Sequence, residues 1–275
     1  MSNVYTYTTE IKNKQYNIDL MKYITEYKGL FNSIQRKAFH IIKNSYINVG
    51  KFTLQDKNAL TKNIATTYNF TARTASSIVY NMTGRFNAIK ELKEYEQKQL
   101  ETKIKSLEKK IAKTEKARQK LNLRMALNTA TKKEQEKYEK LKISLYWRRN
   151  KLNKLKRKIK KLEKEIKIQR YKVCFGTKKL LQTDYKKFVE QRDSELFYVG
   201  NATDPVCNNN FQMRYNKKDN QFYFKIRKEI NTVPDKYVRG KVYFSKSQTK
   251  KIKELLRSKE SPLTYRIKVK DGKYY

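Results

Sequence analysis

Residues 141–172, LKISLYWRRNKLNKLKRKIKKLEKEIKIQRYK, decide how this chain of 275 residues is organised. Their apolar members recur at intervals of three, four and seven, which is the spacing of one face of an α-helix. They are Leu141, Leu145, Leu152, Leu155, Ile159, Leu162 and Ile166. The segment therefore predicts a long helix that packs along one stripe and leaves its other faces to solvent or to a partner.

The other faces of this predicted helix are strongly basic. Between positions 148 and 172, thirteen Lys or Arg stand against two Glu, a net charge of +11 in 25 residues. Like charges repel at i,i+4 spacing, so a helix that meets only solvent usually mixes both signs. A polyanion offsets this repulsion, and nucleic acid is the expected one. The alternative is a solvated coiled-coil surface. The side chains expected to follow phosphates are Lys151, Lys154, Arg157, Lys158 and Lys161.

The single Trp of the chain lies at the start of this basic segment. Trp147 is followed by Arg148 and Arg149 and preceded by Tyr146. An indole beside two guanidinium groups is suited to stacking on a base or ribose. It is equally suited to fastening the helix to the rest of the fold, and the sequence leaves both interpretations open.

The composition limits the class of protein. The net charge is +40 and the isoelectric point is about 10.0, which indicates nucleic acid or an anionic membrane surface as partner. No apolar run is long enough to span a bilayer, and the N-terminus has no apolar signal core, so a cytoplasmic protein without a membrane partner is expected. Cys174 and Cys207 form no CxxC pair, so two free thiols are expected.

The first half of the chain predicts helices after one strand. Residues 4–11 alternate as a β-strand does, and residues 18–43 carry a helical apolar stripe. Thr53 and Asp56 approximate a capping box at the start of the next helix. Residues 54–86 resemble a helix-turn-helix, in which Arg73, Thr74 and Ser77 would face a DNA groove; a plain helix pair is the alternative.

Two long helices are expected next. Residues 86–127 keep a seven-residue apolar repeat, and residues 128–131 interrupt it. The basic helix then returns through residues 141–168. The sequence thus predicts an antiparallel coiled-coil hairpin over residues 87–171, about 55–60 Å long at 1.5 Å per residue.

After residue 172 the apolar period changes from 3.6 to 2. Short strands are predicted at residues 173–176, 196–200, 211–215, 221–227, 241–245 and 264–270, with a turn at 217–220 and a helix at 248–259. Six strands at this spacing favour a small barrel or sandwich. Asp271 and Gly272 predict a tight turn, and residues 273–275 would begin a partner strand. We therefore expect a chain that is truncated at this point.

Three segments in order resemble a known family. They are YNFTARTASSIVYNMTGRFNAIKELKEYEQKQLETKIKSLEKKI (68–111) with the basic return helix, CFGTKKLLQ (174–182), and QRDSELFYVGNATDPVCNNNFQM (191–213), which leads to FYFKIRKE (222–229) and YRIKVKDGKYY (265–275). This order is similar to the N-terminal half of TnpB-like (OrfB) proteins, the transposon-encoded relatives of type V CRISPR effectors. The likeness covers residues 60–275.

The resemblance implies a fold and a set of contacts. The fold class would be α+β, with a helical recognition lobe at residues 18–171 inserted into a small antiparallel β-barrel. Residues 1–17 would give the first barrel strand and residues 172–275 the remainder. The family binds guide RNA and target DNA. The residues expected near nucleic acid on this basis are Gly176, Lys178, Lys179 and Arg192, to which we add Arg214 and Arg227.

No catalytic group is expected in these 275 residues. The family's RuvC-like nuclease domain, which holds divalent metals with several carboxylates, would follow the last strand. Here the hairpin acids Glu101, Glu108, Glu163 and Glu165 are expected to form ion pairs, and His40 to lie in packing or at the surface. No cofactor is expected in this chain, and whether the protein is an enzyme is left open.

The sequence thus favours the RNA- and DNA-binding part of a TnpB-like, transposase-associated RNA-guided endonuclease. The nuclease half would be missing or encoded separately. Two alternatives remain: a stand-alone DNA-binding regulator that uses residues 54–86, and a basic coiled-coil structural protein that dimerises through its apolar stripes.

Overall fold

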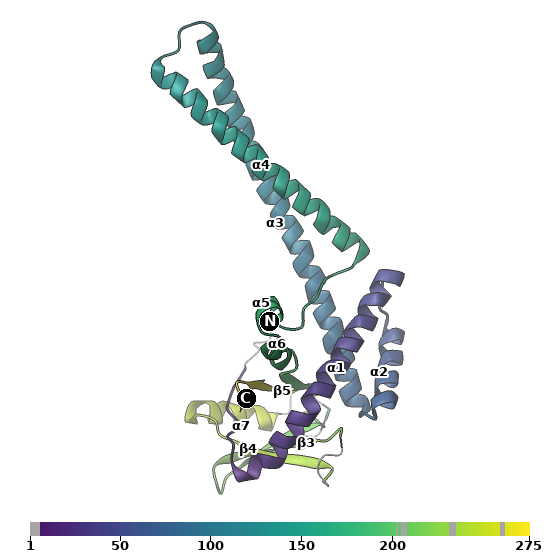
Figure 1. The fold of residues 1–275 in the computed structure, drawn as a ribbon. Coiled ribbons are helices and arrows are strands. Elements are labelled where there is room, and N and C mark those ends of the chain that lie inside the picture. The colour runs from purple at the N-terminus through teal and green to yellow at the C-terminus, as the bar shows by residue number, and fades with distance from the viewer. Residues whose placement is uncertain (1–5, 202, 205–207, 231–234, 259–261) are drawn as a thin grey trace. The chain divides into compact units, whose positions relative to one another are not determined.

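The computed structural model describes residues 6–201, 203–204, 208–230, 235–258 and 262–275 (Figure 1). The chain is mixed α+β, as predicted, and contains two antiparallel three-stranded sheets. It divides into two compact units. The sheet unit comprises Met1–Ser45, Lys51–Gly84 and Val173–Tyr275, and the long-helix unit comprises Tyr46–Gly50 and Arg85–Lys172. The predicted division at residues 17/18 differs from this one, because residues 18–45 and 51–84 group with the sheets.

Helix α1 (Ile18–Val49) supplies much of the core of the sheet unit. It follows a short 3₁₀ turn, η1 (Gln15–Asn17), and runs through Gly29 without a break. Tyr27 and Phe31 are fully buried, and the Phe31 ring meets Phe197 edge-on at 5.3 Å. Aromatic rings therefore fill the space that aliphatic side chains fill in most cores.

Helix α2 (Leu54–Tyr68) begins with the capping box that the sequence predicts. The Thr53 hydroxyl accepts from the Asp56 backbone N–H, and the Asp56 carboxylate accepts from Thr53 N at 2.8 Å. These bonds satisfy two of the free donors at the helix start and lower the pKa of Asp56, with the Thr53 backbone bond as the largest cause. Asn69, with φ of 52°, ends the helix in the left-handed conformation.

Helix α3 (Ala72–Ala126) is one continuous helix of 55 residues. The predicted second helix of the helix-turn-helix and the predicted first helix of the hairpin are therefore the same element. Helix α4 (Lys132–Ile168) starts nine residues before the basic stretch, at a second capping box formed by Thr131 and Glu134. This capping box can be recognised in the sequence, but the helix was predicted to begin only at residue 141.

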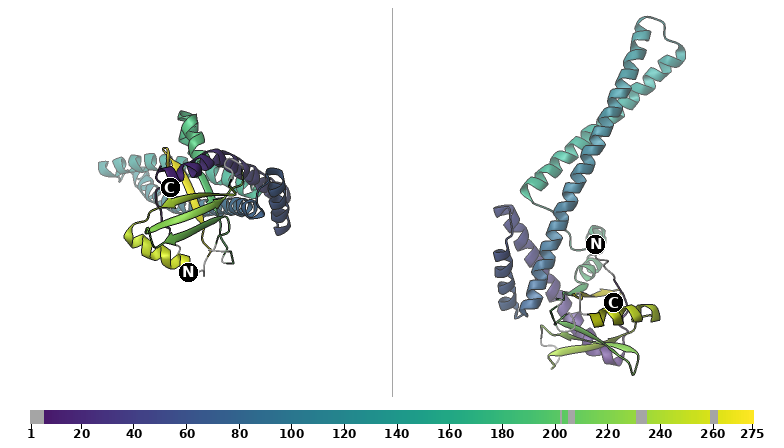
Figure 2. Two further views of the ribbon diagram at one scale, coloured as in Figure 1. Left: turned by 90° about the horizontal axis from the view of Figure 1, so that it is seen from below. Right: turned by 180° about the vertical axis from the view of Figure 1, so that it is seen from behind.

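In the long-helix unit, α3 and α4 lie side by side and run antiparallel (Figures 1 and 2). Their facing side chains recur at the predicted spacing. Those that are buried are Leu100, Ile104, Ile111, Thr114 and Leu121 on α3, and Leu145 and Leu162 on α4. Burial along this one stripe leaves the remaining faces of both helices exposed.

The sheet unit holds two separate sheets. In the first, β1 (Glu195–Tyr198) pairs with β5 (Tyr265–Lys270), which pairs with β6 (Lys273–Tyr274). In the second, β2 (Phe211–Asn216), β3 (Gln221–Arg227) and β4 (Tyr237–Val242) form an antiparallel meander. No strand ladder joins the two sheets in the described ranges, so the predicted barrel is not closed there. Phe211 stacks on Tyr265 at 4.2 Å and packs one sheet against the other.

Two predicted strands are wrong. Within residues 6–11 of the predicted first strand, only Ile11 makes a bridge, to Tyr274; positions 4–5 lie outside the described residues. The predicted strand at 173–176 is irregular, because Gly176 takes φ of 131°. Two helices that the sequence analysis missed follow it: α5 (Lys178–Thr183) and α6 (Tyr185–Arg192). Helix α7 (Lys246–Ser258) lies close to its predicted position.

Candidate nucleic-acid interface

The outer face of α4 carries a row of unpaired cations. Lys154, Arg157, Lys161 and Lys164 are spaced three and four residues apart, so they share the helix face opposite the buried stripe. All four are exposed. In the described part of the chain no carboxylate lies within ion-pair distance of any of them. We call these four residues the outer row. Lys164 was not among the predicted contacts, and Lys151, which was, is also exposed and unpaired among the described residues.

Other predicted contacts on α4 are used inside the long-helix unit. Arg148 donates to the Thr114 hydroxyl and to the Lys110 carbonyl of α3. Arg149 pairs with Glu115 at 2.5 Å, and Lys158 pairs with Glu96 at 2.9 Å. These three cations fasten α4 to α3. They are therefore less available to a ligand than the outer row.

Trp147 lies at the surface. Its side chain is 65% exposed, and its ring neighbour, Tyr146, is 62% exposed, with 5.5 Å between the ring centres. Both precede the outer row on the same broad side of α4. Of the two interpretations left open by the sequence, this exposure favours an indole available for stacking over a staple within the unit.

The outward face of the β2-β3-β4 sheet carries five cations. Arg214 lies opposite Tyr223, and Arg227 lies opposite Tyr237, in the strand register. Strand alternation brings both predicted contacts to one face. These two arginines were predicted contacts, whereas the tyrosines and lysines between them were not, although their period of two was visible.

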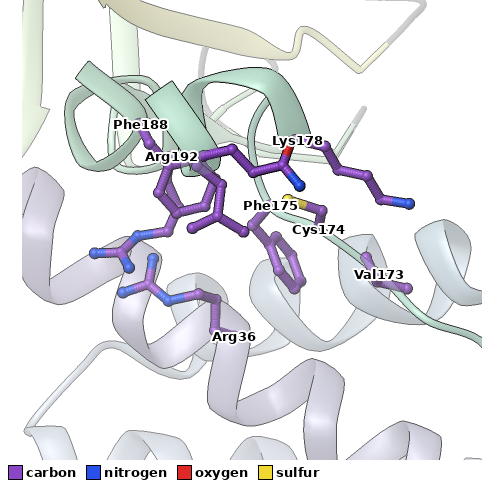
Figure 3. Close-up of a pocket in the computed structure, with 9 residues that line it drawn as sticks. Arg36, Val173, Cys174, Phe175, Lys178, Phe188 and Arg192 are labelled. Carbon is purple, nitrogen blue, oxygen red and sulfur yellow. The ribbon is translucent and has the colours of Figure 1, made fainter. Parts of the chain in front are cut away.

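A shallow pocket of about 390 Å³ lies beside α5 and α6 (Figure 3). Phe175, Leu181 and Phe188 supply its apolar wall. The guanidinium groups of two arginines lie at one end and Lys178 extends at the other. The cationic lining residues are Arg36, Lys178 and Arg192.

Two of those cations are held by one acid. Asp193 accepts from Arg36 and, at 2.8 Å, from Arg192. Burial of Asp193 acts to raise its pKa and is the largest single influence. The hydrogen bonds and charges of Arg192 and Arg36 together outweigh it, so the pKa of Asp193 is lowered. Arg192 is thus mainly a structural partner. Lys178 and Lys179 are exposed.

Gly176 has a packing role. A Cβ on Gly176 would lie 2.8 Å from the Phe188 ring, and its φ of 131° is unfavourable for other residues. The structure thus explains this glycine by the close approach of Phe188. Nothing in the geometry requires a ligand there.

Two of the three positions that a helix-turn-helix would turn toward DNA are buried, and Arg73 is half-buried. Thr74 and Ser77 are 4% and 7% exposed. Arg73 pairs with Asp204 at 2.7 Å. The burial of Thr74 and Ser77 speaks against the helix-turn-helix interpretation, one of the two left open for this segment, because the start of α3 packs into the sheet unit.

A carboxylate that follows β3 binds the start of α3. Glu229 accepts from the Thr71 backbone N–H at 2.8 Å, from the Thr71 hydroxyl at 2.7 Å and from the Thr74 hydroxyl at 2.6 Å. Asn210 also donates to Thr74, at 2.8 Å. A negative charge at a helix N-terminus is stabilising, so Glu229 explains why Thr71 and Thr74 face inward.

The acids of the long helices are in part ion-paired, as predicted. Glu108 pairs with Lys156 at 2.8 Å and Glu165 with Lys93 at 3.8 Å. The prediction is wrong for Glu101, which accepts from the Gln97 amide, and in the described ranges Glu163 has no ion pair. His40 is exposed and contacts Asn44.

Cys174 is a free thiol, and Cys207 lies outside the described residues. The described residues hold no group of three His, Cys, Asp or Glu arranged for a metal ion. Within the same residues, every helix is too short or too polar to cross a bilayer. Comparisons with protein-family profiles, with curated proteins and with solved structures return no match to this chain.

Proposed function

We propose that this chain binds nucleic acid, as the guide-RNA- and target-DNA-binding part of a TnpB-like RNA-guided endonuclease. The observation that carries the proposal is the outer row on α4. Four cations there lie on one exposed face without acidic partners among the described residues, while the inner cations of the same helix are paired with α3. Such a surface is stabilised by a polyanion, whose binding releases the counterions that would otherwise screen the charges.

Two finer structural features belong to this proposal. We infer that α3 and α4 form a coiled-coil hairpin, since their buried residues keep the seven-residue repeat. The two open sheets would then be the counterpart of the small barrel that the TnpB-like resemblance implies. The ladder bond from Ile11 to Tyr274 supports this, because it joins the start of the chain to its last strand.

In this proposal, the target sequence is recognised by base pairing with the guide RNA. In RNA-guided systems the protein contacts the backbone of the heteroduplex and the guide selects the target. The outer row is suited to backbone contact, because ammonium and guanidinium groups bind phosphate irrespective of the base. A nuclease half and its divalent metal would come from outside these 275 residues.

The two alternative functions have less support. A helix-turn-helix regulator needs Thr74 and Ser77 at the surface, and both are buried. A structural coiled-coil protein needs free apolar stripes to dimerise, whereas the stripes of α3 and α4 are buried against each other. Neither alternative explains why the unpaired cations are gathered on one face.

The test is to purify the chain from its host without nuclease treatment and to sequence the nucleic acid that remains bound. We expect a discrete RNA that is retained at moderate salt. Host RNA and DNA of many sequences, lost on a modest rise in salt, would support a general polyanion binder and contradict the guide-binding role. A preparation free of nucleic acid would contradict the proposal altogether.

A further inference from the structure

The outward face of the β2-β3-β4 sheet differs in composition from its inward face. Strand alternation sends Phe222, Phe224, Ile226, Val238 and Val242 inward, where all five are buried. The opposite positions on the three strands carry five cations and two tyrosines, together with Gln212, Asn216 and Gln221, of which Gln212 is buried. We call the following residues the outer sheet face: Arg214, Tyr223, Lys225, Arg227, Tyr237, Arg239 and Lys241.

We propose that the outer sheet face binds an unpaired nucleic-acid strand, with its tyrosine rings stacking on bases and its cations on phosphates. This inference rests on the proposed function and deepens it, because it assigns single-stranded nucleic acid to one surface. The 3₁₀ turn η1 contacts one end of this face, where the Tyr16 ring lies 4.8 Å from Lys241 Nζ. Arg214 and Arg239 are exposed, and the other five residues of the outer sheet face are half-buried.

The charge of this face is one-sided. Strands β2, β3 and β4 contain five Lys or Arg and no Asp or Glu. All five cations fall on the outward side. Only Arg239 has an acidic partner among the described residues, Asp235 at 2.9 Å. The remaining positive charge is available for phosphate groups.

The aromatic rings lie among these cations in two groups. Lys241 Nζ lies 4.7 Å from the centre of the Tyr223 ring and 4.8 Å from that of Tyr16. Lys225 Nζ lies 4.6 Å from the centre of the Tyr237 ring. Tyr237 lies opposite Arg227 in the strand register, and Arg227 is four residues from Tyr223 along β3. The two groups are therefore about 13 Å apart along the strand direction. One strand of nucleic acid can therefore meet both groups.

The Tyr223 and Tyr237 rings each have a lysine ammonium group near one face. An ammonium group over a tyrosine face gains about 0.5–1 kcal/mol at an exposed site. A base stacked on the same face gains more, and the displaced ammonium remains beside the phosphate that accompanies the base. The lysine and the ring thus serve the same nucleotide.

The proposed ligand is a single strand because stacking on tyrosine rings requires unpaired bases. Bases within a duplex are covered by their neighbours, so only an unpaired base can stack on a protein ring. A row of cations without rings, such as the outer row on α4, contacts phosphates of either form. Tyrosines spread over a sheet favour the unpaired form alone.

The experiment measures binding of the full chain to three probes by fluorescence anisotropy. The probes are a 12-nucleotide RNA without secondary structure, the same sequence as DNA, and the DNA in a blunt duplex. The variant is Tyr223→Ala with Tyr237→Ala. The control is Tyr223→Phe with Tyr237→Phe, which keeps both rings and loses the Tyr223 hydrogen bond to Asp219. Circular dichroism establishes that both variants are folded.

We expect the alanine variant to lose affinity for the single strands by about tenfold or more for each ring. The phenylalanine variant should retain it, and duplex binding should stay unchanged in both. Unchanged single-strand binding in the alanine variant would overturn the inference. So would an equal loss for single strand and duplex. Failure of the wild-type chain to bind any probe would instead contradict the proposed function.

A second measurement does not depend on the fold of a variant. RNA carrying 4-thiouridine is crosslinked to the wild-type chain and the attached peptides are identified. Crosslinks within β3 and β4 at Tyr223 or Tyr237 are expected. Crosslinks confined to α4 would overturn the assignment of this face while leaving the proposed function in place.

Discussion

Lys158 of α4 and Glu96 of α3 form an ion pair between the two long helices, with Nζ 2.9 Å from Oε1. The same carboxylate also pairs with Lys93, at 3.4 Å. The hydrogen bond from Lys158 is the largest cause of the lowered pKa of Glu96. The carboxylates of α3 thus neutralise cations on the inner side of α4 and leave its outer row without partners.

Glu96→Gln should lower the stability of the long-helix unit at pH 7 by up to about 1 kcal/mol, as expected of a partly exposed pair. Because the pKa of Glu96 is lowered from 4.5, its contribution is present above that pH and is lost as the pH falls through the folded-state value. Urea unfolding followed by circular dichroism at pH 7 and pH 3.5 measures both effects. The control is Glu163→Gln, and equal stabilities of the two variants at pH 7 would contradict the role of the pair.

Glu229→Ala should destabilise the sheet unit by about 1–3 kcal/mol, because it leaves the donors of Thr71 and Thr74 unsatisfied. Glu229→Gln keeps an acceptor oxygen and should lose less. Thermal unfolding of both variants gives the comparison. Glu190→Ala, at an exposed position on α6, is the control. A loss no greater than that of the control would show that Glu229 does not hold the start of α3.

The chain should lose stability above pH 10. Burial raises the pKa of Tyr23 and of Tyr27 well above 10.0. Because the folded-state pKa of these tyrosines is raised, their contribution to stability is complete below pH 10. It is lost as the pH rises toward the folded-state pKa, because the unfolded chain releases these protons first. In a titration above pH 10, the last rise in tyrosinate absorbance should coincide with the loss of helical circular dichroism. Complete ionisation near pH 10 in a folded chain would contradict the burial.

Gly240→Ala should destabilise the sheet unit by about 1–3 kcal/mol. A Cβ at this position would lie 2.5 Å from Phe224 and 2.7 Å from Leu20, so α1 and β4 could not approach as closely. Gly84→Ala on α3 is the matched control, since nothing lies within 4 Å of its added Cβ. That control should gain about 0.5–1 kcal/mol from helix propensity. Similar melting temperatures for the two variants would contradict this packing.

Strongly periodic segments were predictable from the sequence, and positions fixed by tertiary packing were not. The apolar spacing of α4 and the alternation of β3 identify the buried face of each element. Strand β3 lies at its predicted residues, and α4 includes its predicted residues but begins nine residues earlier, at Lys132. Thr74 fits a helix-turn-helix equally well, because its inward position depends on Glu229, which is 155 residues away along the chain. Local spacing carries no information about such a partner.

Strand β4 shows the same limit. The sequence predicts it at residues 241–245. The strand lies instead at Tyr237–Val242, and Gly240 is inside it because Leu20 and Phe224 leave no room for a side chain. Among the site residues, Lys154, Arg157 and Lys161 could be predicted from charge alone. The structural roles of Arg148, Arg149 and Lys158 depend on where α3 places its acids.

The measurement that tests the central claim most directly is the salt dependence of nucleic-acid binding by a variant of the outer row. Lys154, Arg157, Lys161 and Lys164 are changed to Gln together. The control removes four exposed cations from α7 and so has the same net charge; its sites are Lys246, Lys250, Lys251 and Arg257.

Loss of four phosphate contacts should reduce the slope of log K against log salt by up to about 3.5. We expect that reduction in the outer-row variant, together with weaker binding at every salt concentration, and a much smaller change in the α7 control. Equal slopes in the two variants would show that the chain responds only to its net charge. That result would contradict the claim that the outer face of α4 is the nucleic-acid interface.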